Sequence, residues 1–456
     1  MEKDLTTGSV LKNILYFSLP YLLSYFLQTL YGMADLFIVG QFNGVESITA
    51  VSVGSQVMHM LTVMIVGLAM GSTVTIGKAV GAKQKKQASL TVGNTVTLFM
   101  GLSIVLTLLL LLLVNPIVSW ISTPAEAVVG TRQYLTICFI GIPFITAYNI
   151  ISSIFRGLGD SKSPMYFIAV ACAANILLDY LFIGGLHFGA AGAALGTTLS
   201  QTISVFVALV AVLRRTTGLP LKKEDFKLKT KIMEQILKIG VPVALQDGFI
   251  QIAFIVITII ANRRGLNDAA AVGIVEKIIG VVFLVPSTML STVSALSAQN
   301  IGAGKHERAS LTLRYAVSIA VGFGLVVSLI VQFCGSSVVG IFTKDAEVIL
   351  LGTQYLRAYI WDCMIAGVHF CFSGYFCAYG FSGISFLHNA LSIILVRIPG
   401  AFLASKYFAD TLYPMGLAAP AGSLLSVVIC VIAFLWMKRV TVHTAARHLL
   451  SGCVRK

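Results

Sequence analysis

The chain has 456 residues, of which 57% are hydrophobic and 11% charged, and its formal net charge is +14. A mean hydropathy of +0.91 excludes a water-soluble globular protein, because that much apolar surface has to face lipid. The basic residues lie in short loops and one central segment between apolar runs, which argues against nucleic acid as the reason for the charge.

Twelve apolar runs of about 20 residues or more predict twelve transmembrane helices. They cover residues 14–40, 47–76, 90–114, 134–155, 166–185, 190–213, 239–262, 271–300, 311–334, 355–378, 388–408 and 415–437. Because the runs are continuous, they favour helices over β-barrel strands, which would alternate apolar and polar residues. The predicted fold class is an all-α polytopic membrane protein.

The twelve runs form two groups of six, separated by a hydrophilic segment. We expect a first lobe at 1–213, a cytoplasmic linker at 214–238, a second lobe at 239–440 and a cytoplasmic tail at 441–456. Lysine and arginine gather in the even-numbered loops and the linker, so the positive-inside rule places both termini in the cytoplasm. Six spans per lobe predict a pseudo-twofold axis along the membrane normal.

The two lobes repeat each other in sequence. The segment 80–90 (VGAKQKKQASL) returns as 301–311 (IGAGKHERASL), and the offset between Gly81 and Gly302 is 302 − 81 = 221 residues. Nearly the same offset relates Pro20 to Pro242. In a membrane chain such a repeat predicts a transporter of two bundles with its substrate site near their interface.

Ionisable residues inside the first six spans are candidates for function, because a charge at mid-bilayer costs about 2.5–3.5 kcal/mol. Asp35 shares a helix face with Gln28 and Tyr31, and Asp179 shares one with Asn175. If the two faces converge, the carboxylates hold a proton or a cation such as Na⁺ between them. The alternative is that each aspartate caps a kink or pairs with a basic residue, although no basic residue lies inside these spans.

The second lobe offers different acids. Asp247 and Gln251 lie one turn apart in the seventh span, where Asp247 either attracts a cationic substrate or bonds to backbone freed by Pro242. Arg397 is expected to pair with one of three acids, namely Asp247, Asp362 and Glu276. At the repeat offsets Asp35 stands opposite Val256 or Ile257, and Asp179 opposite Ala401 or Phe402. We therefore expect cation chemistry in the first lobe alone.

Motifs for catalysis and for structural metals are absent from the sequence. It contains no HExxH, P-loop or GxSxG pattern and no Cys/His ligand spacing, which predicts that the chain is not an enzyme and needs no cofactor. Gly380-Phe-Ser382-Gly383 resembles the GxSG of rhomboid-type intramembrane serine proteases, and His369 and His388 lie near it in sequence. An intramembrane protease is therefore a remote alternative.

Several motifs together resemble the multidrug and toxic compound extrusion (MATE) family over residues 10–440. They are Leu19-Pro20, Gln28-Thr-Leu-Tyr31 with Asp35, Val39-Gly40, Gly67-Leu-Ala-Met-Gly71, Gly81-Ala82, Arg156-Gly-Leu-Gly-Asp160-Ser-Lys-Ser-Pro164, Asn175-Ile-Leu-Leu-Asp179, Gly192-Ala-Ala-Leu-Gly-Thr197, Ala298-Gln-Asn-Ile-Gly302-Ala303 and Arg397-Ile-Pro399. The resemblance implies two six-helix bundles that form a V-shaped cleft, and drug export driven by Na⁺ or H⁺ entry. It also implies that Asp35 is the essential acid of the first helix, with Asn175, Asp179 and Thr197 as cation ligands. Thr198 is adjacent, so helical phase could favour either threonine.

The expected protein is a secondary antiporter that exports lipophilic cations in exchange for H⁺ or Na⁺ by alternating access. Gln28, Tyr31, Asp247 and Gln251 are its candidate cleft residues. We expect a monomer in a bacterial-type plasma (inner) membrane, with no nucleic-acid partner. The alternative within transport is a flippase for a lipid-linked oligosaccharide, which would need a strongly basic cavity, whereas the intramembrane bases here are Lys277 and Arg397.

Overall fold

The computed structural model describes residues 4–121, 123–214 and 221–453, and the elements within these ranges are helical. Eleven helices are long and apolar enough to cross a membrane, or twelve if the bent pair Ala125–Ile140 and Ile142–Gly157 forms one span. These segments coincide with the twelve predicted spans, so the predicted all-α membrane fold is confirmed. Contacts divide the chain into unit 1 (Met1–Gly248, Thr288–Ala316 and Cys377–Ser382) and unit 2 (Phe249–Ser287, Val317–Phe376 and Gly383–Lys456).

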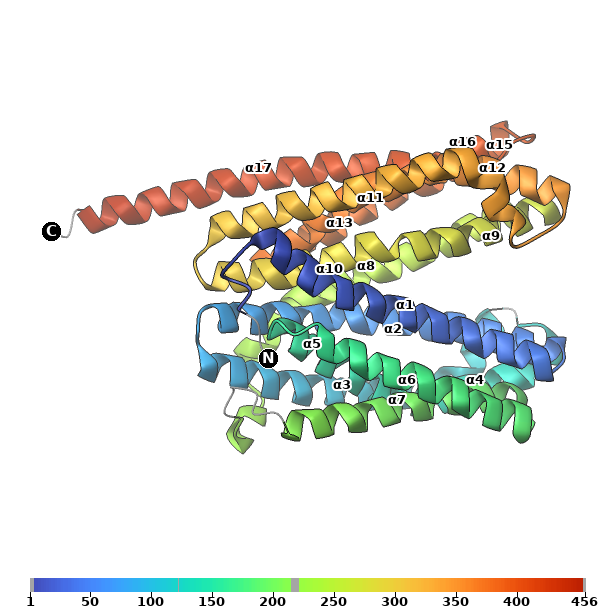
Figure 1. Cartoon of the computed structure of the whole chain (residues 1–456), viewed down its shortest axis with the longest axis horizontal. Coiled ribbons are helices and arrows are strands. Elements are labelled where there is room, and N and C mark those ends of the chain that lie inside the picture. The colour runs from blue at the N-terminus through green and yellow to red at the C-terminus, as the bar shows by residue number, and fades with distance from the viewer. Residues whose placement is uncertain (1–3, 122, 215–220, 454–456) are drawn as a thin grey trace. The chain divides into compact units, whose positions relative to one another are not determined.

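The helices of the first repeat are long and lie side by side in unit 1 (Figure 1). Their bounds are α1 Val10–Phe42, α2 Val45–Gly81, α3 Lys85–Trp120, η1 Ala125–Ala127, α4 Val128–Ile140, α5 Ile142–Gly157, α6 Lys162–Asp179, η2 Tyr180–Gly185 and α7 Gly189–Arg214. Ser9 caps α1 because its hydroxyl accepts the N–H of Lys12. Pro20 lies inside α1, and the hydroxyl of Ser24 donates to its carbonyl at 2.9 Å.

The second repeat contains more interrupted spans. Its elements are η3 Lys223–Phe226, α8 Thr230–Asn262, α9 Leu266–Val282, α10 Leu284–Gly302, α11 His306–Gly340, α12 Ala346–Tyr359, α13 Trp361–Tyr379, α14 Ser382–Ser392, η4 Ile393–Arg397, α15 Ile398–Tyr407, α16 Tyr413–Gly416 and α17 Ala418–Cys453. The seventh span was predicted to begin at 239, but α8 begins at Thr230 and so takes in the end of the predicted linker. Hydropathy did not predict residues 230–238 as part of this helix, because a helix continues through polar residues once its backbone is hydrogen-bonded.

The repeated segments 80–90 and 301–311 form the same helix–turn–helix in unit 1. After α2, Gln84 N–H donates to Ala79 O and Lys83 N–H to Val80 O, and after α10 Lys305 and Gly304 make the equivalent bonds. This pattern is a Schellman turn, which places one residue in the left-handed region. That residue is Lys83 in the first copy, with φ 59°, and Gly304 in the second, with φ 72°.

The two copies also pack against each other. A Cβ added to Gly81 would overlap the carbonyl of Gln299, and one added to Gly302 would overlap the carbonyl of Lys78. The partners keep the repeat offset, since 299 − 78 equals 302 − 81. The α2–α10 crossing is therefore symmetric, and it requires glycine on both sides.

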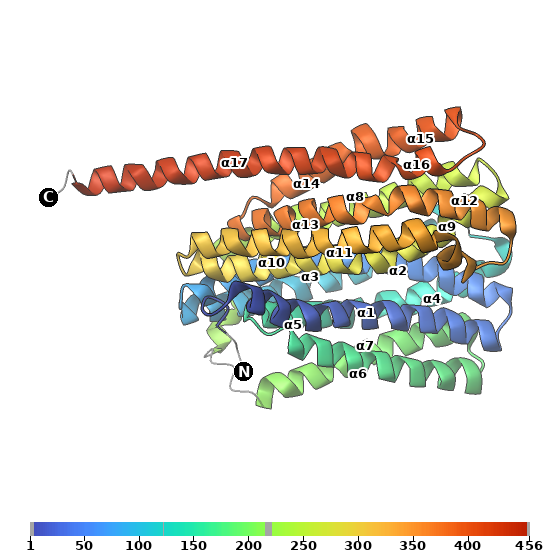
Figure 2. The same ribbon diagram turned by 45° about the horizontal axis from the view of Figure 1, so that its top comes forward.

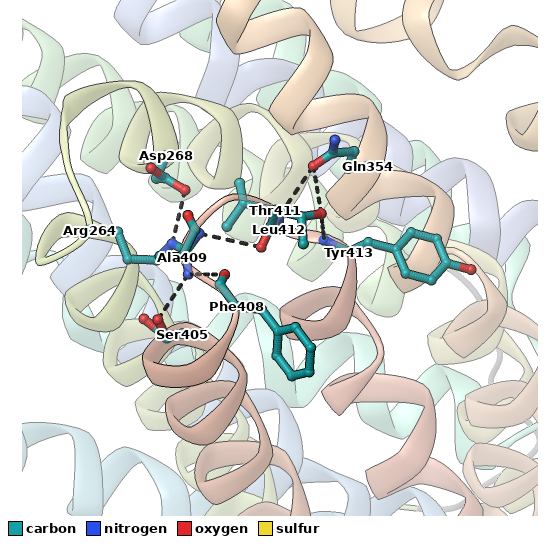
Figure 3. Close-up of polar contacts among 9 residues, drawn as sticks. All are labelled: Arg264, Asp268, Gln354, Ser405, Phe408, Ala409, Thr411, Leu412 and Tyr413. Atoms are coloured by element: carbon teal, nitrogen blue, oxygen red, sulfur yellow. Dashed lines mark hydrogen bonds and ion pairs between the residues drawn. The ribbon is translucent and has the colours of Figure 1, made fainter.

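In unit 2, α12 lies beside α9 and α16 (Figure 2). The apolar core of this unit includes Val272, Tyr355, Leu356 and Met415 of these helices. Its turns are held by Arg264, whose Nε contacts Asp268 at 2.9 Å (Figure 3). The other four donors reach the carbonyls of Ser405, Phe408, Ala409 and Thr411. All five guanidinium donors are thus used, and four of them join the α8–α9 turn to the end of α15 and the segment that follows it.

Candidate functional site

Three helices of unit 1 bring together the four predicted cation ligands. Asp35 lies on α1, Asn175 and Asp179 on the last turns of α6, and Thr197 on α7. α6 packs against both α1 and α7, so one face of each helix meets the others. Residues far apart in sequence therefore form one cluster, which we call the α1–α6–α7 cluster (Asp35, Asn175, Asp179 and Thr197).

The cluster is buried and centred on the Asp35 carboxyl group. Asp35 is 3% exposed, and Asn175 and Asp179 are 0% exposed. The Thr197 hydroxyl donates to Asp35 Oδ2 at 3.0 Å. Asp179 and Asn175 approach the same carboxyl closely enough to interact with it electrostatically, but no hydrogen bond of normal geometry forms.

A glycine and a π-helical turn surround the Asp179 carboxylate and make space for it. Asp179 packs against Gly196 of α7, where an added Cβ would overlap its Oδ1. The backbone changes to a π-helical turn, η2, directly after Asp179, and Leu186 N–H donates to Leu181 O at 2.9 Å. Such turns are rare and are frequent at functional sites. In the sequence, Gly196 stands out only as part of the Gly192–Thr197 motif, and nothing there predicts its contact with Asp179.

Several polar atoms of the cluster have no partner. They are Asp35 Oδ1, both carboxylate oxygens of Asp179, and both amide atoms of Asn175. A buried polar group without a hydrogen bond costs about 1–3 kcal/mol, and more if it is charged. Carboxylate, amide and hydroxyl oxygens facing one another fit a proton or a hard cation such as Na⁺.

The two adjacent threonines of α7 point to different neighbours, because successive residues of a helix face different directions. Thr197 faces Asp35, whereas Thr198 lies against Gly141, where an added Cβ would sit 2.6 Å from its Cγ2. The structure therefore brings Thr197 into the cluster and not Thr198. Tyr134 and Cys138 of α4 lie near Asp35 as well, and the sequence carried no signal for either.

The four cleft candidates lie on α1 and α8. Tyr31 lies near Asp35 and packs against the apolar cluster around Tyr148, so it borders the cation site. Gln28 is partly exposed one turn earlier. On α8, Asp247 is partly exposed and lies against Gly67 of α2, where an added Cβ would be 2.8 Å from its Oδ2. Gln251 follows one turn later and is also partly exposed.

The expected ion pair of Arg397 is not formed. Among the residues that the structure describes, Arg397 takes part in no ion pair and donates instead to the Tyr359 hydroxyl. Thr258 donates to Glu276, and the two oxygens of buried Asp362 have no hydrogen-bond partner. The prediction was wrong: the guanidinium donates to a phenol and lies over the rings of Phe254 and Tyr359, which costs less desolvation than burying a second charge.

The residues of the protease alternative do not form a catalytic pair. Ser382 Oγ donates to the carbonyl of Lys238 at 2.9 Å. His388 Nε2 lies 2.9 Å from Ser373 Oγ, and His369 Nε2 lies 3.3 Å from Ser423 Oγ. The hydroxyl that the sequence motif singled out therefore bonds to a backbone carbonyl, and each histidine lies against another serine.

Comparison with protein families matches the chain twice. The family model described as MatE covers residues 20–181 and again 242–403. The two matches lie 242 − 20 = 222 residues apart, which agrees with the repeat seen in the sequence. Together they account for more than half of the chain.

Similar proteins of known name and known structure span nearly the whole length. "Probable multidrug resistance protein YoeA" of Bacillus subtilis is 27% identical, with 94% of this chain and 95% of the relative covered. "Multidrug export protein MepA" of Staphylococcus haemolyticus is 25% identical, with 89% of each covered. A MOP superfamily transporter from Pyrococcus furiosus has a TM-score of 0.89 at 23% identity, with 96% and 97% covered. At that identity the structural likeness shows the fold alone.

Proposed function

Because the chain belongs to the MatE family of membrane transporters, we propose that it is a secondary antiporter that exports lipophilic cationic compounds in exchange for H⁺ or Na⁺. The names of its relatives, which are multidrug resistance and multidrug export proteins, support drug efflux. The observation that carries the coupling is the buried α1–α6–α7 cluster, which holds two carboxylates and no basic side chain.

The charge balance of the cluster requires a positive partner. Two carboxylates at 3% and 0% exposure repel each other in a low-dielectric interior, and a basic residue is missing from the cluster. The pair therefore takes up at least one proton or metal cation in the coupling step. Thr197 orients the Asp35 carboxyl by donating to Oδ2, so that Oδ1 is left to receive the cation.

Coupling follows if the cation and the drug prefer different states of the cluster. A cation held between Asp35 and Asp179 draws α1 toward α6, and its release lets the two charges separate. Pro20 gives α1 a point at which to bend. A drug exported by such a cycle has to bind more tightly to the cation-free state, because a ligand with equal affinity for both states shifts nothing.

The preference for cationic drugs is supported by Asp247. This carboxylate is partly exposed on α8, and the residues that the structure describes give it no ion pair. An uncompensated acid inside a span attracts a positively charged ligand. We also propose, from the distribution of lysine and arginine, that both termini face the cytoplasm.

The test is export of a fluorescent lipophilic cation from proteoliposomes under separately imposed Na⁺ and pH gradients. Asp35→Asn keeps the shape of the side chain but removes the charge, so we expect export to fall to the level of empty liposomes. Glu46→Gln removes an exposed carboxylate from the same repeat and should export like wild type. Undiminished export by Asp35→Asn would refute the assignment, and the gradient that drives wild type identifies the coupling ion.

A further inference from the structure

The segment that precedes α8 is held against α3 in unit 1. Asn94 Nδ2 donates to the carbonyl of Asp225 at 3.2 Å, and Asn94 Oδ1 accepts the N–H of Lys229 at 2.7 Å. A Cβ added to Gly93 would overlap the carbonyl of Asp225, so the backbone of the segment lies directly on α3. Residues 221–231, which we call the lysine segment, therefore have a fixed place on this helix.

The lysine segment has a positive surface. Its one exposed acid is Glu224. The other acid, Asp225, is buried, and its carboxylate accepts the N–H of Lys222 at 2.8 Å. Among the residues that the structure describes, the lysines of the segment take part in no ion pair. These exposed lysines are Lys222, Lys223, Lys227, Lys229 and Lys231.

Apolar side chains are exposed between these lysines. Leu221 and Phe226 are each 39% exposed, and Leu228 is 59% exposed. A linker that only crosses water gains nothing from such side chains, because apolar surface is more stable out of water. Lysine interleaved with leucine and phenylalanine is instead typical of segments that lie in the headgroup region of a membrane.

The lysine segment lies where the lipid-facing surface of α3 begins. α3 is buried over residues 88–95, whereas Leu102 is 40% and Ile104 55% exposed. The hydroxyl of Thr97 donates to the carbonyl of Phe226 at 2.9 Å. Thr97 precedes Leu102 by 102 − 97 = 5 residues, which is about 7.5 Å of helix. The segment is therefore at the level of the lipid headgroups rather than out in the solvent.

We propose that the lysine segment is a binding surface for acidic phospholipids. Its lysines contact the lipid phosphates, and Phe226 and Leu228 enter the boundary between headgroups and acyl chains. Free phosphate or an acidic protein would use the lysines but would leave these apolar side chains in water. Because α8 begins at Thr230, the bound lipid also holds the start of that helix. The proposal goes beyond drug export and does not depend on it.

The test places a fluorophore at Leu228→Cys in the full-length protein, reconstituted in mixed phosphatidylcholine and phosphatidylglycerol. Cys334→Ser and Cys453→Ser direct the label to residue 228, because the other native cysteines are buried. A trace of either lipid carries a nitroxide near the top of its acyl chain and quenches the fluorophore on contact. Iodide is the quencher from the aqueous side.

We expect the nitroxide-labelled phosphatidylglycerol to quench about two- to fivefold more than the labelled phosphatidylcholine, because lysines concentrate acidic lipids around them. Lys227→Gln with Lys229→Gln, which flank residue 228, should bring the ratio near one. The matched control is Lys85→Gln with Lys86→Gln. It removes two exposed lysines at the start of α3, about 18 Å along the helix from Thr97, and should leave the ratio unchanged.

Equal quenching by the two lipids, or a ratio that survives Lys227→Gln with Lys229→Gln, would overturn the proposal. A fluorophore at Gln84→Cys, in the exposed turn before α3, is the aqueous reference and should respond mainly to iodide. The same response at residue 228 would place the segment in water and contradict the proposal. The ratio should be equal in phosphate and chloride buffers of one ionic strength. Its loss in phosphate, or on addition of polyglutamate, would mean that the segment binds free phosphate or an acidic protein instead.

Discussion

Thr197 and Thr198 are adjacent on α7 but have different surroundings. Thr197 donates to Asp35, whereas Thr198 packs on Gly141 with its hydroxyl buried and unpaired. A hydrogen bond to a charged group contributes about 1.5–3 kcal/mol. The two threonines are therefore a matched pair for measuring the contribution of this bond to cation binding.

We predict that Thr197→Ala shifts the half-saturating concentration of the coupling cation roughly ten- to one-hundred-fold, toward tighter binding if the cation is a proton, because the hydroxyl stabilises the charged Asp35 carboxylate. Thr198→Ala removes the same hydroxyl one position later and should change it less than threefold. The measurement is drug export against the concentration of the coupling cation. Equal effects of the two substitutions would show that Thr197 has no special part in cation binding.

Lys83 and Gly304 occupy the same position of the repeated turn. Both have a left-handed backbone, with φ 59° and 72°. This conformation costs about 1 kcal/mol for a residue that has a Cβ, whereas it costs glycine nothing comparable. The first copy of the turn is therefore strained and the second is not.

We predict that Gly304→Lys lowers the free energy of unfolding by about 1 kcal/mol. Lys83→Gly should raise the free energy of unfolding by a smaller amount. Glycine has more conformational entropy in the unfolded chain, and this offsets part of the strain that the substitution removes. The measurement is Tm by thermal unfolding in detergent. A destabilising Lys83→Gly would mean that the lysine side chain contributes more than the turn conformation costs.

At the level of elements, the segment Asp4–Ser9 before α1 is bound by the start of α11. Lys305 Nζ donates to the carbonyl of Thr6 at 2.8 Å, and Arg308 donates to those of Thr7 and Gly8. The segment Lys222–Lys229 before α8 is bound by α3 in turn, since Asn94 Oδ1 accepts the N–H of Lys229. Each repeat therefore begins with a segment that is held by the other repeat.

Asp4 makes the first of these segments sensitive to pH. The Thr6 hydroxyl and N–H donate to Asp4 Oδ1, and with the charges of Lys305 and Lys83 they lower the pKa of Asp4 against the opposing effect of burial. A lowered pKa stabilises the segment at neutral pH, and this contribution is lost as the pH falls through that pKa.

We predict that Asp4→Asn at pH 7 speeds amide hydrogen exchange in residues 5–9, because the substitution removes the charge that holds the segment. Asp410→Asn, which changes an exposed loop acid of unit 2, should leave exchange there unchanged. The measurement is the rate of amide hydrogen exchange in the N-terminal peptide of each variant, followed by mass spectrometry. Identical exchange in Asp4→Asn and wild type would show that the Asp4 charge does not hold the segment.

At the scale of the whole molecule, the repeat produces the α2–α10 crossing by which its two copies pack together in unit 1. Gly81 and Gly302 each lie on a carbonyl of the other copy. Because those contacts are with backbone, no side-chain movement can relieve an added methyl group. The glycines of the repeated motif are therefore required by packing.

We predict that Gly81→Ala and Gly302→Ala each destabilise this crossing by about 1–3 kcal/mol. Gly273→Ala in α9 has open space around its added Cβ and should be neutral or stabilising. Tm and drug export should fall together for the first two variants. Normal values for both would mean that α2 and α10 separate easily at this crossing.

Hydropathy and spacing were sufficient for the twelve spans, the repeat and the shared helix faces. These features depend on bilayer thickness and on helical periodicity, which act within 20 to 40 residues of chain. The same reasoning set the start of α8 too late, because a helix end depends on backbone hydrogen bonds as well as on apolarity. It also paired Arg397 with an acid, where the structure has the Tyr359 hydroxyl.

By itself the sequence determined that this protein is a doubled, twelve-span membrane chain with acids at Asp35 and Asp179. Only the tertiary structure decided that these acids meet, although they lie 179 − 35 = 144 residues apart, and that Thr197 joins them. It also decided that Gly196 makes room for Asp179. The reason is that such contacts depend on how separate helices pack and rotate, which local periodicity does not encode.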